Sequence, residues 1–300
     1  MDINKIVEKI ISNMQHDRDA LSHEPYEHLS NKELILTLIR KTTGSDILQY
    51  CSIDIQNDKD VVLAIMPKYG NDLQYASDRL KNDKEVALAA INHCGLNLYY
   101  LSDELKQDKE MILAAVKKDG RAFEDAPEDL KDDDNFAWLA YDQNSDSLQF
   151  VSDRLKKDKA FINKCVEKFG YSLDYAHEDM KKDRDIALKA VTSVGWSLIY
   201  VAENLKDDEE VVKAAIKQSG LNIQYASPRL RKDKNMALLA YLNVEEKNYS
   251  QVFEQLHNNL CKEILNNGNI PMQYLPKAIL KEKLESKLPM KPNVNNKNKI

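Results

Sequence analysis

Residues 83–107 read DKEVALAAINHCGLNLYYLSDELKQ, and residues 108–132 read DKEMILAAVKKDGRAFEDAPEDLKD. Both stretches carry a starting aspartate, a small-residue pair, a glycine and a leucine at the same offsets. Alignment of the chain at this 25-residue interval needs no insertion and places an aspartate in one column: Asp58, Asp83, Asp108, Asp133, Asp158, Asp183, Asp208 and Asp233. Such a period predicts a repeat array, in which each unit buries its apolar face against its neighbours.

A second column holds glycine in most units, with Ser145 as its exception: Gly70, Gly95, Gly120, Gly170, Gly195 and Gly220. Seven full units span residues 58–232, preceded by a looser unit and followed by a partial one. Terminal repeats of an array need a polar outer face, so we expect helices to cap the last unit. The predicted organisation is an N-terminal helix and connector (1–30), a repeat solenoid (31–241), a C-terminal helical cap (242–287) and a disordered basic tail (288–300).

Each unit begins with the signals of an α-helix. The column aspartate can accept hydrogen bonds from the first N–H groups of a helix, and an acidic residue two places later suits the helix dipole. Apolar residues then follow at helical spacing, as in Val86, Ala87, Ala90 and Ile91. We expect the glycine to end this helix in the left-handed conformation, which gives a first element of about 12 residues.

The second half of each unit is more ambiguous. In residues 98–105, some apolar residues recur at every second position as in a strand, and others are spaced as in a helix. This mixture predicts an extended or turn-like segment followed by one or two helical turns. A parallel strand at the same place would instead give a β/α horseshoe of leucine-rich-repeat type. Adjacent apolar residues such as Tyr100 and Leu101 would point to opposite faces of a strand. The favoured fold class is therefore all-α, an α-helical solenoid.

The pattern D-(K/R)-(E/D)-hydrophobic-x-L-A-A-(V/I)-K-x-x-G-x-x-L-x-Y-A-S-x-x-L-K resembles the bacterial and protist repeat catalogued as domain of unknown function 4116. Two of the 25-residue units would make one unit of that family, and the resemblance covers about residues 31–240. It implies a repeat scaffold, often found in proteins of intracellular bacteria, amoebae or large viruses, and it assigns no activity and no functional residues. Residues 133–157 depart from the pattern, because they lose the glycine and gain Phe136, Trp138 and Tyr141.

Composition narrows the class of protein. The chain is 43% hydrophobic and 31% charged, as folded water-soluble chains are, and no apolar run approaches the roughly 20 residues that span a bilayer. Its net charge is −6, and the last 25 residues hold seven lysines and two glutamates, so residues 1–275 carry −11. That charge argues against nucleic-acid binding. The four cysteines show no paired spacing, and the N-terminus shows no cleavable signal peptide. These features predict a cytoplasmic protein, or one exported without such a peptide.

No motif for catalysis, a cofactor or a metal is evident, so we expect no enzyme activity and no cofactor. The acidic runs at 131–135 and 206–210 each contain a capping aspartate, which explains them structurally. His23 and His28 lie in the expected connector. Cys165 occupies the small-residue column and is interpreted as a core residue rather than a nucleophile.

The residues around the glycine column suggest where a partner would bind. Apolar side chains precede or follow the glycine in several units, and helices that end at one offset would place them along one edge. The predicted partner-binding residues are Tyr69, Leu96, Phe169, Tyr171, Val194, Trp196 and Leu221. The alternative is that these side chains pack between adjacent turns. The predicted function is a non-catalytic protein–protein interaction scaffold for an unidentified protein; the alternative is a secreted bacterial effector with an undetected activity on a host protein.

Overall fold

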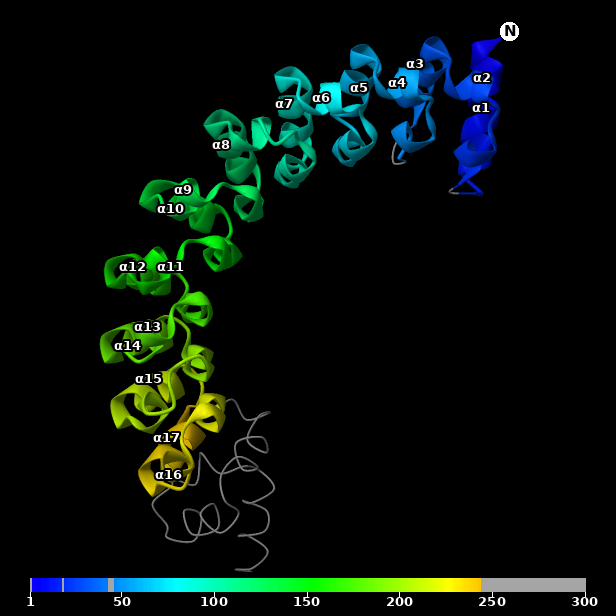
Figure 1. Ribbon diagram of the computed structural model, residues 1–300. Coiled ribbons are helices and arrows are strands. Elements are labelled where there is room, and N and C mark those ends of the chain that lie inside the picture. The colour runs from blue at the N-terminus through cyan, green and yellow to red at the C-terminus, as the bar shows by residue number, and fades with distance from the viewer. Residues whose placement is uncertain (1, 18, 43–45, 244–300) are drawn as a thin grey trace, which may run out of the picture. The chain divides into compact units, whose positions relative to one another are not determined.

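The computed structural model describes residues 2–17, 19–42 and 46–243 (Figure 1). The chain divides into two compact units, Met1–Phe161 and Ile162–Ile300, which are described separately below. The predicted cap and tail lie outside the described residues from position 244 onward.

The first unit is a row of short helices, in which each 25-residue repeat contributes one main helix and the short helices that link it to the next. It opens with α1 (Ile3–Met14), η1 (Ala20–His23) and α2 (Tyr26–Leu29), where η denotes a 3-10 helix. The main helices are α3 (Lys32–Lys41), α5 (Lys59–Ile65), α7 (Lys84–His93), α8 (Lys109–Lys118) and α10 (Asp134–Gln143). They are linked by η2 (Leu48–Tyr50), α4 (Ile53–Gln56), η3 (Gly70–Tyr75), α6 (Asp78–Lys81), η4 (Gly95–Tyr100), η5 (Leu105–Gln107), η6 (Gly120–Asp125), α9 (Glu128–Lys131), η7 (Ser145–Phe150) and α11 (Asp153–Lys157).

The unit boundary falls within α12 (Lys159–Lys168), and the second unit repeats the same order of elements. Its main helices are α14 (Arg184–Ser193), α15 (Glu209–Gln218) and α17 (Lys234–Leu242). The links are η8 (Gly170–Tyr175), α13 (Glu178–Lys181), η9 (Gly195–Ile199), η10 (Leu205–Asp207), η11 (Gly220–Tyr225) and α16 (Pro228–Arg231).

One repeat shows how the sequence produces this order. Asp83 Oδ1 accepts hydrogen bonds from the backbone N–H groups of Glu85 (3.0 Å) and Val86 (3.2 Å), which starts α7 as predicted. Within α7 the side chains of Val86, Ala87, Ala90 and Ile91 are buried, and α7 packs against α8. The next residues form the 3-10 helix η4. Because the part of the chain that the structure describes contains no strand, the β/α horseshoe is excluded there and the all-α solenoid is confirmed.

The expected role of the glycine column is wrong. None of the six glycines of this column adopts a left-handed φ, and α7 ends instead where Cys94 turns to an extended conformation (φ −147°, ψ 124°). Glycine is needed for a different reason: a Cβ on Gly95 would overlap the carbonyl oxygen of Ala115 in the following repeat. In the second unit a Cβ on Gly170 would overlap Ala190 O in the same way. The column therefore permits close approach between neighbouring repeats.

The atypical repeat at 133–157 keeps the common architecture. Asp133 caps α10, and η7 starts at Ser145 where other repeats use glycine. Tyr141 is fully buried and lies against Trp138, with ring centroids 5.4 Å apart. Tyr141 thus adds core volume, Phe136 and Trp138 are half-buried, and the order of elements is unchanged.

Candidate interaction surface

Capping aspartates hold neighbouring repeats together as well as starting helices. Lys59 Nζ lies 2.8 Å from Asp83 Oδ2 and 2.9 Å from Glu85 Oε2. In the second unit Arg184 Nε donates to Asp208 Oδ2 at 2.8 Å. This hydrogen bond from Arg184 holds the pKa of the Asp208 carboxyl below its ordinary value. A cation just after one cap therefore contacts the cap of the following repeat.

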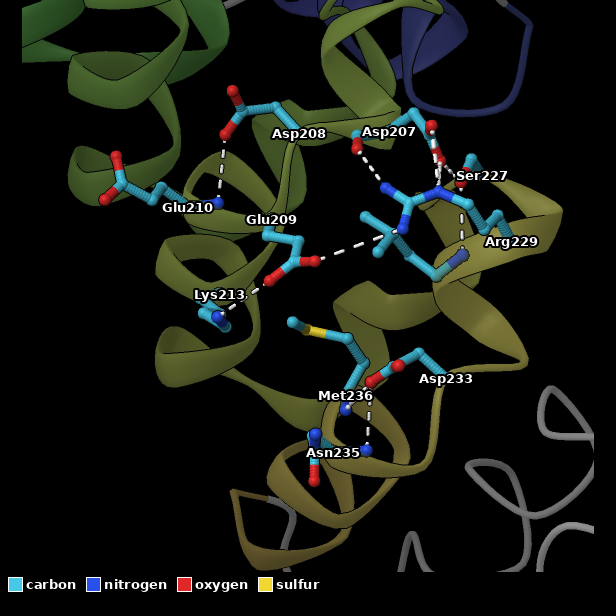
Figure 2. Close-up of polar contacts among 11 residues, drawn as sticks. Asp207, Asp208, Glu209, Glu210, Lys213, Ser227, Arg229, Asp233, Asn235 and Met236 are labelled. Atoms are coloured by element: carbon cyan, nitrogen blue, oxygen red, sulfur yellow. Dashed lines mark hydrogen bonds and ion pairs between the residues drawn. The ribbon is translucent and has the colours of Figure 1, made fainter.

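Figure 2 shows a second set of cross-repeat contacts in the second unit. Arg229 Nε donates to Asp207 Oδ1 at 3.0 Å, and its Nη2 donates to Asp207 O at 2.8 Å. The Ser227 hydroxyl donates to the same carboxylate. In the first unit Asp132, Ser152 and Arg154 form the equivalent group. Both acidic runs noted in the sequence are thus used in capping or repeat contacts.

A row of aromatic rings lies on the second unit, and we call Phe169, Tyr171, Trp196 and Tyr200 the aromatic row. Ring centroids of Phe169 and Tyr171 are 5.6 Å apart, and those of Tyr171 and Trp196 are 6.1 Å apart with planes 10° from parallel. Trp196 meets Tyr200 edge-on at 5.6 Å. Trp196 is 44% exposed, and Ile199 beside it in the chain is 42% exposed.

The local backbone explains why Trp196 is exposed and Tyr171 is half-buried. In η9, Gly195, Ser197 and Leu198 are buried, so the residue between Gly195 and Ser197 lies on the opposite side. Trp196 occupies that place. Tyr171 has the same position in η8, directly after Gly170. A rigid 3-10 helix at a fixed offset thus presents one aromatic residue from each of two successive repeats.

The structure brings three of the predicted partner-binding residues together: Phe169, Tyr171 and Trp196. Val194 and Leu221, also in the second unit, are half-buried. In the first unit Leu96 is 36% exposed, whereas Tyr69 is buried and its hydroxyl donates to Thr42 O at 2.8 Å. The Tyr69 side chain therefore does not belong to an exposed surface.

Sequence reasoning missed Ile199 and Tyr99 as exposed positions. Tyr99 is 62% exposed, lies edge-on to Tyr100 at 5.2 Å, and has Lys106 Nζ 5.2 Å above its ring. A signal was available, since most other repeats carry a polar residue at this offset: Gln74, Glu124, Gln149, Asp174 and Gln224. An apolar residue in a polar column indicates an exposed apolar side chain.

A hollow in the first unit is lined by polar groups that already bind other parts of the chain. Lys68 Nζ donates to Ile39 O at 2.7 Å, and the Tyr50 hydroxyl donates to Asp19 Oδ1 at 3.2 Å. His93 Nδ1 lies 3.2 Å from Pro67 O. These hydrogen bonds hold Lys68, Tyr50 and His93 against other segments of the first unit.

The other residues singled out in the sequence have local roles. His28 Nδ1 lies 2.8 Å from Glu24 Oε2 in the connector. Cys165 is fully buried, and burial raises the pKa of its thiol to about 12. Among residues 2–17, 19–42 and 46–243, no three histidine, cysteine, aspartate or glutamate side chains gather in a way that could hold a metal ion. In the same residues, no helix has the length and apolar character needed to cross a membrane.

Comparison with known proteins agrees with the repeat pattern. The sequence model of one family, described as Domain of unknown function (DUF4116), matches residues 31–81, 58–106, 83–131, 108–156, 133–181, 158–206 and 208–261. No curated protein and no solved structure gives a significant match. The family matches cover more than half of the chain and advance largely in steps of one 25-residue repeat. The chain therefore belongs to the DUF4116 family.

Proposed function

We propose that this protein is a non-catalytic scaffold whose aromatic row binds a protein partner. The observation that carries the proposal is the stacked group of Tyr171 and Trp196, whose centroids lie 6.1 Å apart while Trp196 remains 44% exposed. Exposed aromatic groups on rigid elements are typical anchors of protein interfaces, because they bury a large area at little cost in side-chain entropy.

Rigidity of the underlying repeats supports this proposal. The residue before Trp196 is Gly195, where a Cβ would lie 2.8 Å from Ala215 O, so the backbone beneath the ring is fixed against the next helix. The Phe169 ring has Lys168 Nζ 5.3 Å from its centroid, which places a cation at one end of the row. A partner surface with an apolar centre and an acidic edge would complement this arrangement.

The test compares Trp196→Ala with Tyr26→Ala, a matched control in which a 69% exposed aromatic residue outside the row is removed. Each full-length variant is used to capture proteins from cell lysate, and the dissociation constant of a purified captured protein is measured by calorimetry. Trp196→Ala is expected to weaken binding about 30-fold, or roughly 2 kcal/mol, as interface anchors do. Tyr26→Ala is expected to bind as the wild type does.

Thermal melts of the same variants separate binding from folding. Both substitutions remove an exposed ring, so both melting temperatures are expected to stay within a few degrees of the wild type. Unchanged affinity in Trp196→Ala would contradict the proposal. A large loss of stability in that variant would instead assign the ring to the packing between repeats.

A further inference from the structure

The third position of each 3-10 helix is buried and, in most repeats, polar. It lies two residues after the glycine column and is occupied by Asp72, Asn97, Ala122, Ser147, Ser172, Ser197 and Asn222. Asp72 is fully buried (0% exposed) and is the sole ionisable residue in this set. A carboxyl group therefore stands where other repeats have an amide, a hydroxyl or a methyl group.

The asparagines show what this position does for a repeat. Asn97 Nδ2 donates to Ala90 O at 2.8 Å in the first unit. Asn222 Nδ2 donates to Ala215 O at 2.9 Å in the second. In both repeats the acceptor lies seven residues earlier, in the last turn of the main helix. The amide N–H thus adds a second hydrogen bond to a carbonyl that already accepts from the backbone, from Cys94 N in one repeat and from Ser219 N in the other.

Asp72 supplies the hydrogen-bond acceptor of such an amide and lacks its N–H donor. Its Oδ2 accepts a hydrogen bond from the backbone N–H of Leu48 at 3.0 Å. Its Oδ1 is buried and has no hydrogen-bond partner among the described residues. The carbonyl seven residues earlier, that of Ile65, already accepts from the backbone N–H groups of Lys68 and Tyr69, at 2.9 Å each. A carboxylate at position 72 therefore has a charged oxygen without a donor, whereas a neutral carboxylic acid has no charge to compensate.

We propose that Asp72 is a proton switch for the first repeats: its neutral acid fits a buried column that is uncharged in the other repeats, and its carboxylate leaves Oδ1 charged without a donor. Deprotonation would thus place an unpaired charge in the interior, which destabilises the contact between α5 and η3. The device is independent of the aromatic row, which lies in the other unit.

The surroundings of Asp72 favour the neutral form near neutral pH. Burial raises the pKa of this carboxyl to about 7, against the opposing effect of the backbone N–H groups of Leu48 and Ile47. Asp72 interacts electrostatically with Asp46, Cys51 and Tyr75. The elements packed against η3, and the segment that leads into it, also carry Lys68, Tyr69, His93 and Tyr100.

Most of these groups do not change charge in the relevant range or are bound elsewhere. Burial raises the pKa of the Cys51 thiol to about 12 and also raises the pKa of Tyr75, so both stay neutral. Lys68 donates to Ile39 O at 2.7 Å, and His93 contacts Pro67 O at 3.2 Å. Asp46 is exposed, and its carboxyl further raises the pKa of Asp72 through its charge and through a side-chain hydrogen bond.

The sign of the pH effect follows from this shift. A folded pKa of about 7 lies above the unfolded value of about 4, so the folded protein binds the extra proton between these two values. Stability due to Asp72 is therefore greatest at the acidic end of that window and falls as pH rises to about 7. Above that pH the contribution is constant.

Thermal melts of the full chain between about pH 5 and pH 8.5 test the proposal with reciprocal variants. The wild type is expected to lose several degrees of melting temperature across this range. Asp72→Asn keeps an acceptor for Leu48 and cannot ionise, so it should remove most of this loss and raise the melting temperature at the alkaline end. Asn97→Asp should add a second pH-dependent loss.

Asp46→Asn is the control for this neighbouring carboxyl, and it should leave a clear pH dependence in place, because burial is the larger cause of the raised pKa of Asp72. An unchanged pH profile in Asp72→Asn would overturn the proposal, as would a lower melting temperature of that variant at alkaline pH. If Asp72→Asn does not fold, Asn97→Asp decides: a profile parallel to that of the wild type would show that a carboxyl group at this position is not proton-sensitive.

Discussion

The α-carbon of Gly95 lies so close to the carbonyl oxygen of Ala115 in the next repeat that any Cβ at position 95 would overlap that oxygen. Such a Cβ would also lie 2.9 Å from the backbone nitrogen of Asp119. Both obstacles are main-chain atoms of a helix end, which cannot move aside as a flexible side chain can. The glycine column is thus a steric requirement of the interface between repeats.

This relationship predicts that Gly95→Ala destabilises the protein. At a position without steric conflict, the same change would stabilise by about 0.4–1 kcal/mol through the unfolded chain. Here overpacking against the Ala115 carbonyl should cost about 1–3 kcal/mol. Urea denaturation measures the difference. Ser145→Ala is the control, because that repeat already carries a Cβ; a stabilised Gly95→Ala variant would refute the steric explanation.

Removal of one whole repeat is expected to preserve the fold. Deletion of residues 83–107 joins Asn82 to Asp108, so Lys59 would meet the Asp108 cap in place of the Asp83 cap that it contacts at 2.8 Å. Deletion of residues 83–94 instead places η4 where a main helix is required. Circular dichroism and thermal melts compare the two. Equal helicity loss in both deletions would contradict an array in which each repeat contacts its neighbours.

The capping aspartates predict a loss of stability in acid. Hydrogen bonds from Lys84 and Arg184 hold the pKa values of Asp108 and Asp208 below the ordinary range. Their folded pKa values lie below the unfolded ones, so this stability is complete above about pH 4 and disappears as pH falls further. Thermal melts below that pH should show the decline, with the opposite sign to the Asp72 effect.

The matched test of that decline is Arg184→Ala, which removes the cation from Asp208 and leaves its backbone hydrogen bonds from Glu210 (2.9 Å) and Val211 (3.1 Å). The variant should lose less stability on acidification than the wild type. Asp208→Ala removes the cap itself and should cost about 1 kcal/mol at neutral pH. An Arg184→Ala profile identical to that of the wild type would show that the cross-repeat cation has no effect on the cap.

Cysteine reactivity is expected to follow burial. Cys51 and Cys165 are buried and their pKa values are raised to about 12, whereas Cys94 is half-buried at the end of α7. Alkylation of the native protein at neutral pH should therefore modify Cys94 well before the other two. Mass spectrometry of digested samples at successive times provides the measurement. Early modification of Cys165 would contradict its assignment to the core.

The repeat period and the helix starts could be predicted because they depend on local chemistry. Asp83 caps α7 through N–H groups two and three residues away, and a sequence pattern records such short-range relations directly. The apolar positions of α7, such as Val86 and Ile91, follow from helical spacing in the same way.

What could not be predicted depends on contacts between repeats. The left-handed interpretation of Gly95 failed because an obstacle 20 residues away, Ala115 O, decides which residue fits. Trp196 follows its column glycine and is partly exposed, whereas Tyr69 precedes its own and is buried, with its hydroxyl bonded to Thr42 O in the preceding repeat. The special place of Asp72 likewise emerges only when its Oδ1 is compared with the amide of Asn97.

The cross-repeat bonds described above also bear on folding speed. Arg229 bonds to Asp207 across 22 residues, and Lys59 bonds to Asp83 across 24. Because these separations are set by the repeat, adding a repeat lengthens the chain without lengthening the loops that must close, and relative contact order falls. Chains of this family with more repeats are therefore expected to nucleate as fast as short ones, with structure spreading from any repeat that forms first.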